Sequence, residues 1–243
     1  MNVPIEVVDA TRQRRCALFV GRRASLEAVE QAGAEYPDQR GLARMLEGRK
    51  ALREASSAFA ARRGRDSLIS ALQERIGGGE PGAFHRAAVR MFPRIFTTCW
   101  DDLLERAAVE SGVDVEVRYA GDPIPEPVEG KLLVYKLWGG FERPETLLLT
   151  DADESRLSGV AKDARRVLRK TVCFFVGYRP DEEEFDLIFD ELSEVYGGEL
   201  PRCHLAVAQG RISDYHWQKW VWRGLLLFTA DPAEALEALE TQL

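Results

Sequence analysis

The sequence predicts an α/β fold in which helices cover both faces of a parallel sheet. Segments of strand character alternate along the chain with segments of helical spacing, and several strands, such as residues 171–176, are continuous apolar runs. Such runs are typical of strands that are buried on both faces of a parallel sheet. The chain has 243 residues, of which 45% are hydrophobic and 30% charged, so it is long enough to fold around one large core.

The strands are predicted where apolar or alternating residues are followed by turn signals. Cys16 begins the first apolar run, and Gly21 begins the turn that follows it. Residues 113–118 alternate between apolar and polar side chains, whereas the later strands are mostly apolar. The predicted strands are residues 15–20, 94–98, 113–118, 132–137, 146–149, 171–176, 203–208 and 225–228.

The helices are predicted between these strands, from apolar residues at helical spacing. Residues 41–61 and 66–76 form a helical block that ends at the three glycines of 77–79. We therefore expect one domain over residues 1–243, with a helical insertion subdomain at 33–91. Asp231 and Pro232 predict the start of a terminal helix, because aspartate caps helices and proline fits their first position. The remaining predicted helices are residues 25–32, 101–111, 155–170 and 182–196, with a short helix that begins at Ala83.

The charge of the chain is distributed unevenly. The net charge is −7, but residues 1–90 carry +5 and the remainder carries −12. Between Arg40 and Arg65 there are eight basic residues and two acidic ones. A basic helical insertion of this kind predicts a surface for nucleic acid or an acidic partner. The alternative is a solvated helix face with no partner.

The sequence indicates a cytoplasmic protein without a metal centre. No apolar run approaches the roughly 20 residues that span a bilayer, and the beginning of the chain does not have the pattern of a signal peptide. The four cysteines lack Cys-x-x-Cys spacing, which argues against structural zinc and a disulfide framework. None of the three histidines lies at metal-ligand spacing from another.

The most informative segment runs from Phe92 to Arg106. A strand ends abruptly there and is followed by a helix with Asp101 in its first turn, and ligands of α/β folds bind at such carboxyl ends of strands. The segment resembles the Thr-Thr-Asn-Tyr-Asp-x-Leu-Leu-Glu signature of bacterial sirtuin-like (SIR2-like) domains, which consume NAD. The resemblance extends over nearly the whole chain. It implies a Rossmann-like sheet and places Thr97 and Asp101 in the cofactor pocket.

The turn after the first strand departs from the family pattern. Sirtuin-like domains have Gly-Ala-Gly-Ala-Ser at this point, whereas this chain keeps Gly21, Ala24 and Ser25 but has Arg22 and Arg23 in between. A dinucleotide site needs glycine there, so that backbone N–H groups reach the pyrophosphate. We therefore expect Arg23, at the second glycine, to obstruct the cofactor. The alternative is that a guanidinium group binds the phosphate in place of the backbone.

Two further positions of the resembling family are changed. Cys99 replaces the asparagine of the signature, and a thiol does not supply both the acceptor and the donor of an amide. Trp138, in Lys-Leu-Trp-Gly, replaces the histidine that is the general base, and an indole has no titratable nitrogen. Asp101 is retained. A nucleophilic role for Cys99 is an alternative, because helix N-termini activate thiols.

The turn after the strand at 171–176 matches the family better. Gly177, Tyr178 and Asp181 are kept, while Arg179 replaces a serine. In relatives this loop lies along the adenosine-ribose half of the cofactor. The resemblance therefore implies an ancestral pocket that is formed by Gly21, Arg22, Arg23, Ser25, Thr97, Asp101, Gly177 and Tyr178.

Together, these replacements predict a pseudoenzyme, a catalytically degenerate sirtuin-like domain that serves as a structural or regulatory subunit. No cofactor is required for that role, although NAD or ADP-ribose remains possible. The resemblance, together with the lack of the four-cysteine zinc ribbon of deacetylating sirtuins, implies the defence-effector branch. We thus expect a prokaryotic antiviral assembly with a protein partner or further copies of the chain. Trp217, Trp220 and Trp222 are candidates for a partner-binding patch, because tryptophan is enriched at interface hot spots. The alternative is that they pack where the final strand meets the terminal helix.

Two alternatives belong to other functional classes. One is an NAD glycohydrolase that is active only in a partner-assembled state. The other is a sensor that binds ADP-ribose or an NAD-like nucleotide without turning it over.

Overall fold

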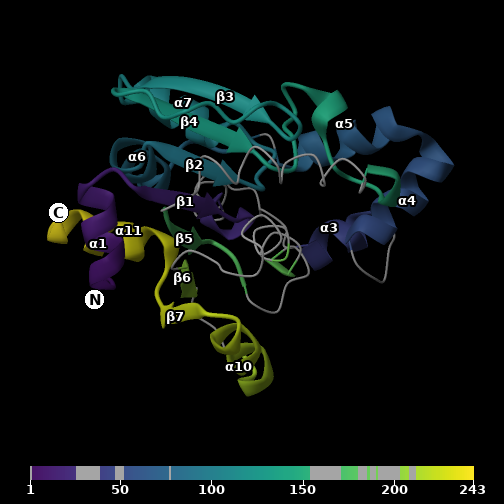
Figure 1. Cartoon of the computed structure of the whole chain (residues 1–243). Helices are drawn as coiled ribbons and strands as arrows, with labels where there is room; N and C mark the ends of the chain where they lie inside the picture. Colours follow the sequence, from purple (N-terminus) through teal and green to yellow (C-terminus); the bar gives the residue numbers. More distant parts are fainter. Residues whose placement is uncertain are drawn as a thin grey trace.

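A seven-stranded parallel sheet forms the centre of the molecule in the computed structural model (Figure 1). The structure describes residues 2–25, 39–46, 52–76, 78–153, 171–179, 185–186, 190, 203–207 and 212–243. The strand order is β3-β4-β2-β1-β5-β6-β7. The strands are β1 (Cys16–Val20), β2 (Arg94–Thr97), β3 (Asp114–Tyr119), β4 (Lys131–Lys136), β5 (Val172–Val176), β6 (Cys203–Val207) and β7 (Leu225–Thr229).

The direction in which the chain builds the sheet reverses at β1. From β1 the chain continues through β2 to β3 and β4 on one side, and after β4 it crosses over to β5, β6 and β7 on the other side. Leu18 of β1 lies opposite Ile95 of β2 and Phe174 of β5 in parallel register. The connections after β1 and β5 therefore leave the sheet in opposite directions, which creates the crevice where α/β folds bind ligands.

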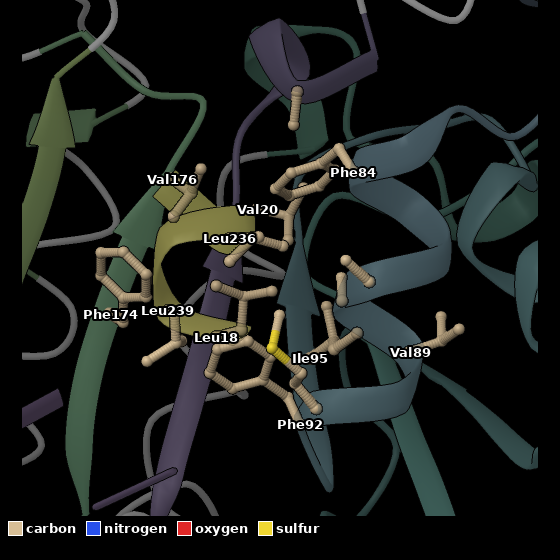
Figure 2. Packing of buried hydrophobic residues seen from close by; sticks show 14 of the residues in the cluster. Leu18, Val20, Phe84, Val89, Phe92, Ile95, Phe174, Val176, Leu236 and Leu239 are labelled. Carbon is tan, nitrogen blue, oxygen red and sulfur yellow. The ribbon is translucent and has the colours of Figure 1, made fainter. Parts of the chain in front are cut away.

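Helices cover both faces of the sheet. Side chains along each strand point alternately to opposite faces, and both sets are apolar, so each face needs cover. Leu18 and Val20 of β1 pack against α6 (Ala83–Met91) and α11 (Pro232–Gln242) (Figure 2). Phe19 belongs to the core cluster of the other face. The first face is also covered by α1 (Ile5–Arg12) and α7 (Leu103–Glu110). On the second face, Phe19 stacks on rings of β2 and β5, and α10 (Asp214–Trp222) contributes the buried Trp220.

Three further helices form a separate cluster toward the carboxyl ends of the strands. These are α3 (Gln39–Met45), α4 (Leu52–Arg63) and α5 (Arg65–Ile76), and Figure 1 shows them at the end of the sheet toward which the arrows point. Their buried side chains pack with Trp100, Phe141 and Leu147. Arg65 of α5 links this cluster to the segment that follows the 3-10 helix η2 (Pro144–Thr146), because its guanidinium group forms an ion pair with Asp153 at 2.8 Å.

The predicted fold class is confirmed, and one predicted strand is wrong. Residues 146–149 form no strand: the chain makes a short 3-10 helix, η2 (Pro144–Thr146), and then buries Leu147 and Leu149 in the cluster of the helical insertion. The apolar residues of this run are therefore explained by their burial and not by pairing with another strand.

Several predicted elements differ from the structure or lie outside it. Helices α1 and α10 were not predicted. Helix α6, at the end of the predicted insertion, packs with the body of the sheet. The predicted helices at 155–170 and at most of 25–32 and 182–196 lie outside the described residues. No helix within the described ranges has the length and apolar character that crossing a membrane requires.

Candidate functional site

The loops that follow β1 and β5 lie directly against each other at the crevice. The N–H of Gly21 donates to the carbonyl of Val176 at 2.8 Å, and the N–H of Arg23 donates to that of Gly177 at 3.2 Å. A Cβ at Gly21 would lie 2.4 Å from the Gly177 carbonyl oxygen. Gly177 itself has a φ of +77°, which other residues rarely adopt. Glycine is thus required at both positions by the contact between the two loops.

Tyr178 and Thr97 both bind the end of β1. The hydroxyl of Tyr178 donates to the carbonyl of Val20 at 3.0 Å, and Thr97 Oγ1 donates to the same carbonyl at 3.1 Å. The ring of Tyr178 is buried against Phe175 and Phe185. The same carbonyl also accepts from the backbone N–H of Thr98 at 3.1 Å, so the two hydroxyl groups add to a backbone bond at the end of β1 and have a structural role at the crevice.

Arg22 is the more buried of the two arginines that follow β1. It belongs to a 3-10 turn, η1 (Arg22–Ser25), and is only 7% exposed. The carbon of its guanidinium group lies 3.8 Å from the ring centroid of Trp100 and 5.5 Å from that of Trp138. The sequence pattern had assigned the obstructing position to Arg23, whose side chain is partly exposed. The two indoles thus hold a buried cation at the carboxyl edge of the sheet.

A chain of hydrogen bonds connects His85 to Cys99. The N–H of Gly82 donates to His85 Nδ1 at 3.2 Å, so the neutral imidazole carries its hydrogen on Nε2. That nitrogen lies 3.3 Å from the hydroxyl of Ser25, and the hydroxyl donates to the sulfur of Cys99 at 3.7 Å. Burial lowers the pKa of His85 to about 4, although the charge of Asp101 opposes the shift. His85 therefore stays neutral at physiological pH.

Asp101 is buried at the start of α7. Its carboxylate accepts from the N–H of Leu103 at 3.2 Å, as an aspartate at a helix start commonly does. Its backbone carbonyl accepts from Lys136 Nζ at 2.6 Å. Among the described contacts, Asp101 thus serves both the helix start and a neighbouring lysine.

Lys136 is a second buried cation at this edge. Its ammonium group lies 2.8 Å from Glu105 and 3.2 Å from Glu142. Burial alone would lower the pKa of Lys136, but the charges of these carboxylates outweigh it and raise the pKa. The pKa of Glu105 is raised by burial, which the charge of Lys136 only partly offsets. The 2.8 Å separation of the ammonium and the carboxylate is that of a direct ion pair, which favours the charged form of both groups.

These residues provide hydrogen-bond donors and fixed charge, and both ring nitrogens of His85 take part in hydrogen bonds. His85 uses one ring nitrogen to accept from the backbone and the other to donate, and Trp138 occupies the position that resembles the family's base. Among the residues that the structure describes, no three His, Cys, Asp or Glu side chains gather as a metal site. Asp181 lies outside the described residues, and Arg179 is partly exposed.

Sequence reasoning did not identify His85, Lys136 and Glu105 as residues of this edge. His85 and Cys99 approach each other only through Ser25, which lies 60 residues from His85 along the chain. The one local signal is the Gly82 turn three residues before His85, since a side chain at that helix position often caps the backbone.

Comparisons with known proteins agree with this architecture. A family model described as "SIR2-like domain" matches residues 93–224. A solved structure described as a Sir2 homologue in complex with NAD aligns with a TM-score of 0.52 at 13% identity, over 99% of this chain and 94% of the other. At that identity the alignment shows a common fold. A search of curated proteins found no match.

Proposed function

The chain belongs to the SIR2-like domain family, and from this premise we propose that it is a catalytically degenerate member, a structural or regulatory subunit that does not turn over NAD. The observation that carries the proposal is the position of Arg22. Its guanidinium group is buried over the ring of Trp100 and within 5.5 Å of the centroid of Trp138, at the carboxyl edge where nucleotides bind in such folds. A buried guanidinium group at this edge supports the proposal, because it would compete with NAD for the carboxyl ends of the strands.

The chemistry of the neighbouring residues supports the same proposal. A general base in sirtuin-like domains is expected where Trp138 stands, and loss of a general base alone removes about 10²–10⁴ in rate. His85 does not replace it, because its pKa of about 4 and its two hydrogen bonds leave no basic nitrogen aimed at the cleft. Cys99 is buried, and its sulfur accepts a hydrogen bond from the Ser25 hydroxyl. A thiol in this position does not supply the acceptor and the donor of an asparagine amide together.

The role as a subunit is supported by the surface of α10. Trp222 is 83% exposed, and Tyr215 and Val221 are also exposed on the same helix. Exposed aromatic side chains of this size are typical of protein interfaces. We place the assembly in prokaryotic antiviral defence, in the cytoplasm, on the strength of the resemblance to the NAD-consuming effectors of that system.

The direct test is nicotinamide release from NAD. Purified protein is incubated with NAD, and nicotinamide is quantified by chromatography beside an Asp101→Asn variant and a blank without protein. We expect the wild type and the variant to match the blank. Steady release by the wild type that the Asp101→Asn variant lacks would show a working active site and would overturn the proposal.

A second candidate is a sensor for an NAD-like nucleotide, which the likeness to the fold of an NAD complex favours. Such binding requires Arg22 to leave its position between the indoles. Calorimetry with ADP-ribose separates the two candidates, since a scaffold gives no heat of binding at millimolar nucleotide. A partner-activated NAD glycohydrolase would instead release nicotinamide only after the partner is added to the incubation.

A further inference from the structure

We infer that Trp100 and Trp138 form a binding cage for a planar organic cation, and that Arg22 is its resident occupant. The inference rests on the proposed function only in that both concern the same cleft. A cage for a planar cation is a property of the two indoles, whether or not any NAD is turned over. The ligand class is a guanidinium or pyridinium group.

The geometry is that of a cation held by ring faces. At 3.8 Å from the Trp100 centroid, the guanidinium carbon is within van der Waals stacking distance of the indole, and the 5.5 Å to Trp138 is within the range in which a ring attracts a cation. Tryptophan has the strongest such attraction of the aromatic residues, and burial strengthens it because less water competes. Trp100 is almost fully buried, and Arg22 is nearly so.

The two walls of the cage are held by contacts that do not involve Arg22. Trp100 packs edge-on against Phe141, and its carbonyl accepts from the N–H of Phe141 at 3.2 Å. The carbonyl of Trp138 accepts from the N–H of Leu148 at 3.1 Å. Both indoles also pack in the cluster of the helical insertion. Removal of the Arg22 side chain should therefore leave the walls in place and create a vacancy of the shape of a planar cation.

The occupant comes from a different element than the walls. Arg22 belongs to the turn after β1, whereas Trp100 follows β2 and Trp138 follows β4. A side chain that is tethered in this way competes with free ligands as an intramolecular partner at high effective concentration. Free cations should thus bind weakly to the wild type and much more tightly once the tethered occupant is removed. In the wild type, exchange of Arg22 for an external cation would release the turn after β1 from the cleft.

The test is cation binding to an Arg22→Ala variant. Methylguanidinium and N-methylpyridinium are titrated into wild type, Arg22→Ala and Arg23→Ala, with N-methylurea as a planar neutral probe. We expect both cations to bind Arg22→Ala at least about tenfold more tightly than the other two proteins, and the neutral probe to bind none of them. A folded Arg22→Ala variant that binds neither cation, or equal binding to all three proteins, would refute the cage.

A measurement on the wild type keeps the inference testable if Arg22→Ala does not fold. The Nε–H and δ-methylene signals of Arg22, assigned with an Arg22→Lys variant, should be shifted upfield in the NMR spectrum by the ring currents of the indoles. Signals at the positions of an exposed arginine would contradict the cage. The two proposals fail separately: nicotinamide release leaves the cation test standing, and absence of cation binding leaves the lack of turnover standing.

Discussion

Two cations are buried at the same edge of the sheet, and the protein stabilises them in different ways. Lys136, at the end of β4, is neutralised by Glu105 and Glu142, whereas Arg22, after β1, lies on the faces of two indoles. The compact, strongly hydrated ammonium group needs opposite charge when it is buried, while the flat and weakly hydrated guanidinium group can stack. The comparison predicts different consequences for the two removals: loss of Lys136 takes a counterion from the mostly buried Glu105, whereas loss of Arg22 takes a cation from the faces of two indoles.

The largest effect is expected from Lys136→Met. This change leaves Glu105, whose carboxylate is mostly buried, without its counterion, and breaking a buried ion pair from one side costs about 3–5 kcal/mol. Urea denaturation measures the free energy of unfolding. The double variant Lys136→Met with Glu105→Leu is the matched control and should recover much of the loss. A single variant as stable as the wild type would show that the carboxylates do not depend on Lys136.

Acid should destabilise the protein through His85. The pKa of this histidine falls from 6.5 to about 4 on folding, so between these values the unfolded chain binds the proton and the folded chain does not. Above pH 6.5 the histidine is neutral in both states and the free energy of unfolding is not reduced. As pH falls toward 4 the free energy of unfolding decreases, and the loss reaches about 3 kcal/mol. Denaturation curves at pH 7 and pH 4.5 for wild type and His85→Gln measure it. A slope with pH that is the same in both proteins would rule out His85 as the source.

A smaller effect is expected from Arg22→Met. The methionine fills part of the space between the indoles but loses the attraction of a cation, which is worth about 2 kcal/mol at a desolvated site. In the same urea series, the free energy of unfolding should therefore decrease clearly less in Arg22→Met than in Lys136→Met. The opposite order would mean that Arg22 neutralises a buried charge, as Lys136 does.

The smallest effect is expected from Trp222→Ser, which lies outside both regions. Because the side chain is 83% exposed, its replacement should change the free energy of unfolding by less than about 0.5 kcal/mol. If α10 is the partner surface, the same variant should lose binding of the partner in a pull-down with the wild type as control. Marked destabilisation would show that Trp222 packs within the folded chain.

The sequence was sufficient for the sheet but not for the arrangement of the site. Strands such as β1 and β5 are continuous apolar runs because both of their faces are buried, and this local pattern predicts them directly. Helix α1 escaped prediction because its residues Ile5, Val7 and Val8 are β-branched, which weakens the helical signal. Residues 146–149 have a strand-like pattern for a different reason, their burial among the helices of the insertion.

At the site, the sequence identified the positions but not the contacts between them. Cys99, Arg23 and Trp138 stand out because the resembling family has other residues there. Nothing local indicates that Arg22 rather than Arg23 turns inward, since that choice depends on the backbone of η1 and on Trp100, which is far away along the chain. The connection from His85 through Ser25 to Cys99 likewise requires the tertiary fold.

The central claim is that the cleft is occupied by Arg22 and does not accept NAD. The most direct measurement is an NMR titration of the wild type with NAD that follows the indole N–H signals of Trp100 and Trp138. We predict that neither signal moves at millimolar NAD, because the guanidinium group remains between the rings. Saturable shifts of both signals at micromolar NAD would contradict the claim.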